Sequence, residues 1–297
     1  DAAGAHYGVI VVRSRNDLLL DGGAGTVGGH GIGNYAQIGH GGAMAAGSTD
    51  PDGALGGHIT VSAQIVGPFD DIGDFYGTDG SVGPDGAFDE ILILPNPSEP
   101  NGIRLVGGAN GDAEGSYVQI GHGGIGRGGS LDGDISIETA RNIHLSGGAG
   151  IDAYAQIGHG GIDAAGSQFV GRIGLVANGS ASLNSGAMPG GYAMIGHGGL
   201  GAGGSLFGGD ICFHSVDGHN LSAGENFVQI GHGGSDANVD ALSGNVSVTG
   251  YGDVQVLGGE ADEAYAQIGH GGLRIDADMS GDVYVVSADN GIFVTGG

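Results

Sequence analysis

Six histidines stand in one repeated eight-residue phrase, and imidazole is the side chain best suited to bind a metal ion or exchange a proton near neutral pH. The first copy, Tyr-Ala-Gln-Ile-Gly-His-Gly-Gly, spans residues 35–42. The histidines are His40, His122, His159, His197, His232 and His270. Every copy keeps Ile-Gly-His-Gly-Gly, whereas the aromatic residue is once Phe227 and the glutamine once Met194.

Two interpretations of this histidine pattern are open. If the rings stack one above another, about 4.8 Å apart, they form a structural ladder in which each ring donates to a carbonyl or to its neighbour. Neutral rings could instead bind Zn²⁺, Cu²⁺ or Ni²⁺, although this spacing is longer than two ligands of one ion usually need. Stacking geometry alone would select an identical residue in every copy, which favours the ladder. Such a stack should be neutral at pH 7 and weaken near pH 5.

The glutamine and the tyrosine of the phrase are expected to form ladders of their own. An amide ladder would lie on the strand face opposite the isoleucine, with an aromatic ladder beside it, and both stabilise stacked identical strands. Their members are Gln37, Gln119, Gln156, Gln229 and Gln267, and Tyr35, Tyr117, Tyr154, Tyr192 and Tyr265. The tyrosines could also form a sugar-binding stripe, but packing within the ladder is the favoured interpretation.

Aspartates beside glycine pairs suggest calcium as a further ligand. Residues 147–152 fit the Gly-Gly-x-Gly-x-Asp core of calcium-binding β-rolls, and residues 107–112 nearly do. The motif recurs once per repeat instead of every nine residues, and chance matches are expected in so glycine-rich a chain. The weak candidate ligands are Asp112, Asp134, Asp152, Asp210 and Asp282, together with the acidic stretch 70–90. No metal is therefore assigned as a cofactor.

One local cluster has the residue types of a glycan-cleaving enzyme. Right-handed β-helices host polysaccharide lyases and hydrolases that use carboxylates or arginine on an outer face. The cluster comprises Asp70, Asp71, Asp74, Asp89 and Arg104, and a solvated acidic loop explains it equally well. The chain has no lysine for a phosphate-binding P-loop, and dinucleotide signatures mean little among 72 glycines in 297 residues. We therefore expect a non-catalytic protein.

The net charge of the chain excludes some classes of binding partner. Seven arginines oppose 33 acidic residues, for a net charge of −26, so neither nucleic acid nor an anionic membrane surface is an expected partner. The single cysteine, Cys212, leaves no intramolecular disulfide and no cysteine-based zinc cluster. No run of 18 apolar residues is present, so no membrane insertion is expected.

The elements that position these residues repeat with a period near 37 residues. Successive phrase histidines are 82, 37, 38, 35 and 38 residues apart. Two further apolar alternations follow each phrase, as at residues 133–137 and 143–145, and alternation bounded by Gly, Asn and Asp predicts short strands. Three strands per period without helical periodicity predict an all-β, three-sided, parallel right-handed β-helix, in which each strand pairs with its equivalent in the next coil.

Residues 64–102 interrupt this single solenoid of residues 1–297. They hold five of the seven prolines and many acids, with a further strand expected near residues 90–93. The interval of 82 residues is about two periods, which predicts one degenerate coil without the phrase, carrying an irregular side-loop, and a gap in the histidine ladder. The register places both ends of the chain in mid-coil. We therefore expect a segment of a longer repeat protein, or a protomer that stacks into a filament.

The phrase, alternating with Gly-Asp-Ile-x-Val-x-Ala and Ile-x-Leu-x-Gly-Gly, resembles the repeats of filamentous-haemagglutinin-like proteins. The resemblance covers nearly the whole chain outside residues 64–102. Those proteins are large secreted β-helical adhesins of Gram-negative bacteria, often exported by two-partner secretion. Their amino-terminal secretion cap is not visible here, so the export route is only implied, and no catalytic residues carry over because the family's repeats are scaffold.

The resemblance implies a non-catalytic extracellular filament shaft or adhesin stalk on the surface of a Gram-negative bacterium. The expected partners are copies or further coils at its ends, and host-cell or surface glycans. Two alternatives stay open: an ion-binding surface filament and, third, a polysaccharide-acting β-helix enzyme.

Overall fold

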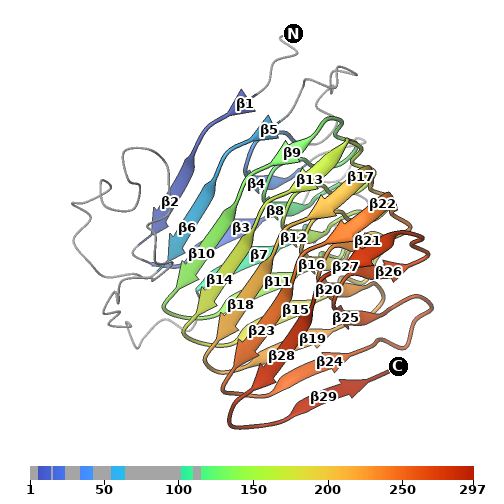
Figure 1. The fold of residues 1–297 in the computed structure, drawn as a ribbon. Coiled ribbons are helices and arrows are strands. Elements are labelled where there is room, and N and C mark those ends of the chain that lie inside the picture. The colour runs from blue at the N-terminus through green and yellow to red at the C-terminus, as the bar shows by residue number, and fades with distance from the viewer. Residues whose placement is uncertain (1–5, 15, 24–33, 43–54, 64–101, 110–114) are drawn as a thin grey trace.

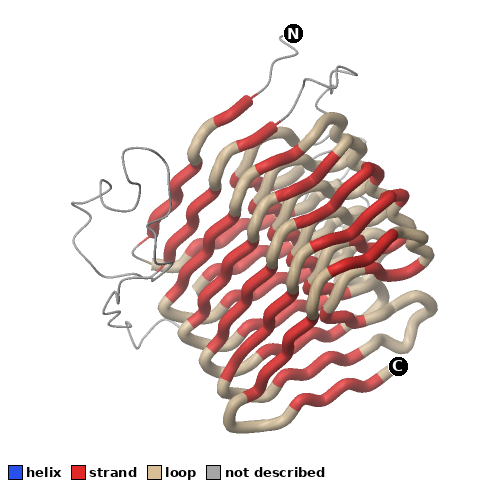
Figure 2. Tube along the Cα trace, viewed as in Figure 1, coloured by secondary structure: helices blue, strands red, loops and turns tan. Residues whose placement is uncertain are grey.

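The computed structural model describes residues 6–14, 16–23, 34–42, 55–63, 102–109 and 115–297. All regular secondary structure within these ranges is β-strand (Figure 2). None of the described residues belongs to a helix long and apolar enough to cross a membrane.

Four long sheets, here named A to D in the order in which the chain visits them, run along the molecule (Figure 1). Sheet A contains β1 (His6–Tyr7), β5 (Leu55–Gly56), β9 (Leu131–Asp132), β13 (Gln168–Val170), β17 (Gly203–Gly208), β22 (Asn238–Ser243) and β27 (Asp278–Ser280). Sheet B contains β2 (Ile10–Ser14), β6 (Ile59–Ala63), β10 (Ile135–Thr139), β14 (Ile173–Ala177), β18 (Ile211–Ser215), β23 (Val246–Gly250) and β28 (Val283–Ser287).

Sheet C contains β3 (Leu18–Asp21), β7 (Ile103–Val106), β11 (Ile143–Ser146), β15 (Ala181–Asn184), β19 (His219–Ser222), β24 (Val254–Leu257) and β29 (Ile292–Thr295). Sheet D consists of the phrase strands β4 (Ala36–Ile38), β8 (Val118–Ile120), β12 (Ala155–Ile157), β16 (Ala193–Ile195), β20 (Val228–Ile230) and β25 (Ala266–Ile268). The short pair β21 (Gly233–Ser235) and β26 (Gly271–Leu273) follows the last two phrases.

These sheets confirm the predicted parallel β-helix. Every strand pairs in parallel with its equivalent one coil away, so that Ile135 lies beside Ile59 on one side and Ile173 on the other. Sheets B, C and D consist of the three strands per coil that the apolar alternation predicts. Sheet A is an additional strand in each coil that the pattern did not reveal, because its strands carry few inward apolar residues, such as Phe169 and Phe207.

The 82-residue interval holds an insertion within one coil rather than a whole coil that lacks the phrase. Strand β4 pairs directly with β8, and β3 pairs directly with β7. Residues 64–102 therefore separate β6 from β7 in the same coil, where only residues 140–142 separate β10 from β11. The insertion thus falls at the corner between sheet B and sheet C. The strand expected near residues 90–93 lies outside the described residues.

The core has three compartments, and sheet D separates two of them. Aliphatic columns from sheets B, C and D fill the largest, while leucines and phenylalanines fill a second behind sheet A. The third lies on the other side of sheet D and contains the aromatic residues of the phrase, among them Tyr154 and Tyr192. Strands such as β12 are consequently buried on both faces, so the polar residues of the phrase must find partners inside the protein.

Candidate functional site

The six phrase histidines form one continuous stack, which we call the histidine ladder. Neighbouring rings are nearly parallel, with centroids 4.7–5.1 Å apart and interplanar angles of 3–11°. The stack is unbroken from His40 to His122, so the insertion leaves no gap. The side chains of His122, His159, His197 and His232 are fully buried.

Two hydrogen bonds hold each ladder ring from His122 to His270 and set its protonation state. The Nδ1 atom of His159 accepts the backbone N–H of His122 in the preceding coil at 3.0 Å. The Nε2 atom of His159 lies 2.7 Å from the carbonyl oxygen of Gly133, and because a carbonyl only accepts, Nε2 carries the hydrogen. The same two contacts recur along the stack at 3.0–3.2 Å and 2.7–2.9 Å. The rings are therefore neutral Nε2–H tautomers.

Glycines on both sides of each histidine make this geometry attainable. Gly158 and Gly160 have φ values of +148° and +113°, which residues with a Cβ rarely adopt. A Cβ added to Gly158 would overlap the carbonyl oxygen of Gly196 in the next coil. The Gly-His-Gly-Gly loop can thus stack as closely as the strands do, which carries every ring to the same place beside the turn between sheets A and B.

Burial keeps the four inner rings of the ladder neutral. It lowers the pKa of His122 to about 4 and the pKa of His159 and of His232 to about 3, although the hydrogen bond from each ring to a glycine carbonyl opposes the shift. Burial and then the rings of its two neighbours lower the pKa of His197 as well. At pH 7 these rings carry no charge.

The same bonds bear on metal binding by the ladder. A neutral imidazole binds a metal ion through its unprotonated nitrogen, and here that nitrogen already accepts a backbone N–H. A metal ion would have to displace one coil-to-coil hydrogen bond for each ring that it uses. Within the described ranges, no group of three or more His, Cys, Asp or Glu side chains is placed to hold a metal ion.

The phrase glutamines bind the histidine loops of the next coil instead of one another. The Nε2 atom of Gln156 donates to the carbonyl oxygens of Gly196 and Gly198, each at 3.1 Å. Gln37, Gln119 and Gln229 make the equivalent pairs of contacts, and Gln267 donates to the carbonyl of its own loop histidine at 2.9 Å. The amide column thus ties side chains to backbone, where the sequence suggested a ladder of amides.

The tyrosines and Phe227 stack in the third core compartment, with ring centroids 4.7–5.2 Å apart. Tyr117, Tyr154 and Tyr192 are fully buried, so their rings have no face to offer a sugar, whereas Tyr35 at the amino-terminal end is exposed. The hydroxyl of Tyr192 donates to Oε1 of Gln156 in the preceding coil at 3.2 Å. This bond joins the aromatic and amide columns between these two coils.

The candidate calcium ligands are spread over separate places. Asp134 and Asp210 lie on the exposed turn between sheets A and B, where each Oδ1 accepts the backbone N–H of the next coil at 2.8 Å. Arg172 occupies the coil between them, and Asp282 follows Asn245 at the same turn. Asp152 lies at a different turn with φ +57°. Asp112 falls outside the described residues.

The proposed catalytic cluster cannot be assembled from the described residues. Asp70, Asp71, Asp74 and Asp89 all lie outside them. Arg104 is on the outward side of β7, paired in register with His144.

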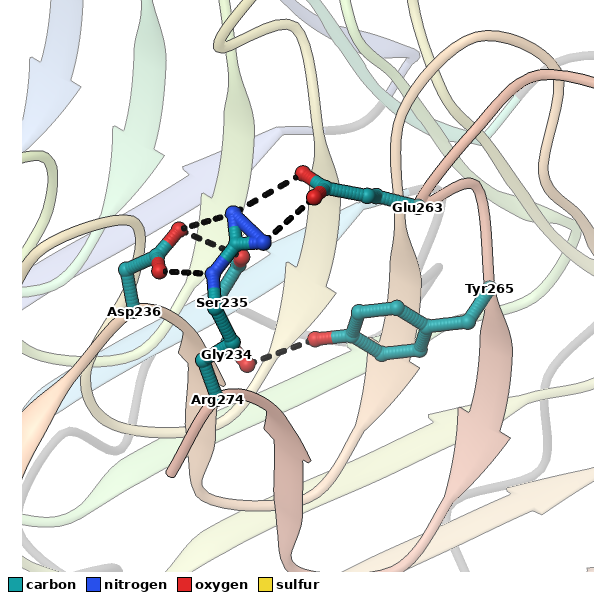
Figure 3. Close-up of polar contacts among 6 residues, drawn as sticks. All are labelled: Gly234, Ser235, Asp236, Glu263, Tyr265 and Arg274. Carbon is teal, nitrogen blue, oxygen red and sulfur yellow. Dashed lines mark hydrogen bonds and ion pairs between the residues drawn. The ribbon is translucent and has the colours of Figure 1, made fainter. Parts of the chain in front are cut away.

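An ion-pair cluster that the sequence analysis did not single out joins the last coils (Figure 3). Arg274 donates from Nε to Oδ1 of Asp236 at 2.6 Å and also contacts the carboxylate of Glu263. All three residues have left-handed φ values of 53–69°, and the equivalent positions in other coils hold either glycine, as at Gly201, or aspartate, as at Asp163. The hydroxyl of Tyr265 points to the same turn and donates to the carbonyl of Gly234 at 2.6 Å. Because the ion pairs are exposed, they contribute little to stability.

Comparison of the chain with models of known protein families, with curated proteins and with solved structures gives no match. The fold and the ladder geometry are the observations from which a function can be proposed.

Proposed function

We propose that this protein is a structural, non-catalytic β-solenoid that forms the shaft of an extracellular filament or adhesin stalk on a Gram-negative bacterial surface. The observation that carries the proposal is the unbroken histidine ladder. Each inner coil, from that of His122 to that of His232, offers the same backbone donor to one neighbour and the same ring acceptor to the other. A side-chain lattice that repeats in this way favours an elongated scaffold.

The bonding is also of the kind that a load-bearing shaft requires. Four parallel sheets join each coil to the next, and buried histidine and glutamine bonds reinforce the same contacts. Bending or shearing the stack would strip buried polar groups of their partners, which costs more than losing a bond in water. The net charge of −26 favours a solvated surface that resists collapse onto other anionic molecules.

The partners proposed for such a shaft are further coils or copies at its ends and, along its surface, host-cell or surface glycans. Purified protein tested on an array of surface glycans would identify the second class. Release of reducing sugars from any of those polysaccharides would overturn the non-catalytic assignment.

Single-molecule force spectroscopy tests the shaft itself. When the chain is pulled from its two ends, we expect stepwise unravelling, with each coil of about 37 residues releasing about 130 Å of chain. His197→Ala should lower the force of the steps at its own coils more than His214→Ala does, because the contact of His214 with Thr249 of the next coil lies on the outer face and is only half-buried. Unravelling at low force without steps would contradict a load-bearing role.

Metal removal separates this proposal from the ion-binding alternative. Because the unprotonated nitrogen of the ladder rings from His122 to His270 already accepts a hydrogen bond, we expect the melting temperature to be the same with and without excess EDTA. A fall in the melting temperature that added Ca²⁺ or Zn²⁺ reverses would favour an ion-binding filament.

A further inference from the structure

The hydrogen-bonding pattern of the ladder leaves one atom per ring where a proton can bind. Nε2 already carries the hydrogen that it donates to a glycine carbonyl, so the free lone pair is on Nδ1. In His197 that lone pair accepts the backbone N–H of His159 at 3.0 Å. A proton on Nδ1 would turn two facing groups into two donors, and the bond between the coils would be lost.

The surroundings offer a protonated ring no compensating charge. The neighbours of His159 along the stack are the rings of His122 and His197. If a neighbouring ring is protonated as well, the two positive charges repel each other. From the turn between sheets A and B the ring faces the carbonyl of Gly133, and Gln156 of sheet D, which is neutral, donates to the backbone carbonyl of His159.

The charged groups of the adjoining turn are Asp134, Arg172, Asp210 and Asp282, and the titratable ring of His58 lies 3.7 Å from Asp134. Asp134 and Asp210 accept backbone N–H groups of the next coil at the surface, although Asp210 also favours the charged form of His232. A charged ladder ring is thus a buried, uncompensated cation.

We propose that the histidine ladder is an acid-sensitive clasp, in which protonation of Nδ1 on a ladder ring releases its coil from the preceding one. The inference rests on the ladder geometry and holds whether or not the protein is a surface shaft. In a shaft, it would keep the coils locked at neutral pH and loosen them in an acidic compartment.

The direction of the effect follows from the two states of each ring. In the unfolded chain a histidine has a pKa near 6.5, whereas in the fold the pKa of His122 is about 4 and that of His159 about 3. The unfolded state therefore binds more protons between these values, and stability falls as the pH drops below 6.5. Each ring lowers the ratio of folded to unfolded protein about tenfold per pH unit in that window, so three such rings lower it about a thousandfold.

The test is urea unfolding of the full chain at pH 7.5, 6.5, 5.5 and 4.5, comparing the wild type with His197→Asn and His214→Asn. Asparagine at position 197 keeps an acceptor oxygen for the N–H of His159 but cannot be protonated. We expect His197→Asn to be less stable at pH 7.5, yet to lose about tenfold less of its folding ratio per pH unit below pH 6.5. His214→Asn, on the outer face of sheet B, should follow the wild-type slope.

An NMR titration of the wild-type imidazole nitrogens is the second readout, and it does not depend on a variant that folds. We expect the buried ladder rings to stay as Nε2–H tautomers down to the pH at which the protein unfolds. Ladder rings that titrate near pH 6.5 in a folded protein would overturn the clasp. So would a His197→Asn slope equal to that of the wild type.

Discussion

Two columns of side chains tie the coils together, one buried and one exposed. In the histidine ladder, Nδ1 of His159 accepts the N–H of His122 in the preceding coil at 3.0 Å. In a second column, on the turn between sheets A and B, Oδ1 of Asp134 accepts the N–H of Arg172 in the following coil at 2.8 Å. We call the second the turn column; its members are Asp134, Arg172, Asp210, Asn245 and Asp282.

Both columns accept a backbone N–H from an adjacent coil, the ladder from the preceding coil and the turn column from the following one. They differ in burial and in how far the residue type varies. The ladder is buried and keeps one residue type in every coil, whereas the turn column is largely exposed and changes between aspartate, arginine and asparagine. Water can replace a lost acceptor at the surface but not in the core. Burial, more than the hydrogen bond itself, thus accounts for the invariance of the phrase histidine.

The first prediction has the largest expected effect, and it tests whether the backbones of adjacent coils pack equally closely beside both columns. A Cβ at Gly158 beside the ladder, or at Gly171 beside the turn column, would overlap a carbonyl oxygen of the neighbouring coil, and both have φ near +145°. We expect Gly158→Ala and Gly171→Ala each to cost more than about 4 kcal/mol in the free energy of unfolding, or to prevent folding. Urea unfolding measures the cost.

Gly174 provides the matched control because it lies in β14 with open space where a Cβ would be. Gly174→Ala should be neutral or stabilise by up to about 1 kcal/mol. If Gly171→Ala were tolerated like Gly174→Ala while Gly158→Ala were not, the turn column would be the looser one in its backbone as well.

The second prediction sets one side chain of each column against the other. His197→Ala would leave the N–H of His159 and the carbonyl of Gly171 buried without partners, and we expect a loss of about 3–5 kcal/mol. Asp210→Ala removes an acceptor that water can replace, so the loss should stay below about 1 kcal/mol. Equal losses in urea unfolding would show that burial is not what distinguishes the columns.

The fold class could be predicted from the sequence because the apolar columns of sheets B, C and D repeat within each period. Sheet A could not, since its short strands contribute isolated residues such as Leu131 and Phe169 to the core. The histidine interval of 82 residues was equally compatible with an extra coil and with an insertion, and only the pairing of β4 with β8 decides between them.

The bonds of the candidate site were beyond the sequence for a different reason. Which nitrogen of His159 accepts and which donates depends on the path of the Gly133 turn, a part of the coil 26 residues away. The partner of Gln156 is likewise a backbone carbonyl of the next coil. Every residue has a backbone carbonyl, so the sequence pattern does not identify which one accepts the hydrogen bond. One signal was present, however, in the two departures from the phrase.

Those departures, Met194 and Phe227, meet at one contact. Where Tyr192 donates its hydroxyl to Oε1 of Gln156 in the preceding coil, the equivalent pair one coil later is Phe227 and Met194. Cε of Met194 also lies as close to a Cβ placed on Gly196 as Nε2 of Gln37 does to one placed on Gly39, at 3.3 Å in both cases. The methionine therefore fills the space of a glutamine next to Phe227 of the following coil, the one ring of the aromatic column without a hydroxyl.

The third prediction is that these two positions are coupled within the buried region. Phe227→Tyr or Met194→Gln alone introduces a buried polar group without the partner that Tyr192 and Gln156 offer each other, whereas the double variant introduces both partners. In a double-mutant cycle we expect the double variant to be more stable than the sum of the single changes by about 1 kcal/mol. Additive effects would mean that the new hydroxyl binds the carbonyl of Gly199, as Tyr265 binds that of Gly234.

The smallest effect concerns the exposed column and explains why it is not aspartate throughout. Equivalent residues of adjacent coils are about 4.8 Å apart, so carboxylates in successive coils would repel one another. Arg172 separates Asp134 from Asp210, and Asn245 separates Asp210 from Asp282 while still accepting the N–H of Asp282 at 2.9 Å. Asparagine thus keeps the hydrogen bond without the charge.

Asn245→Asp should therefore cost about 0.5 kcal/mol at low ionic strength, and the cost should vanish in about 1 M salt, where exposed charges are screened. Adding Asp210→Asn to that variant should recover the loss at low salt by separating the carboxylates again. A cost that persists in high salt would point to the hydrogen bond to Asp282 and not to charge repulsion. The residue type in the exposed column would then be determined by the hydrogen bond between coils, as in the buried column. The two columns would differ only in how much the loss of that bond costs.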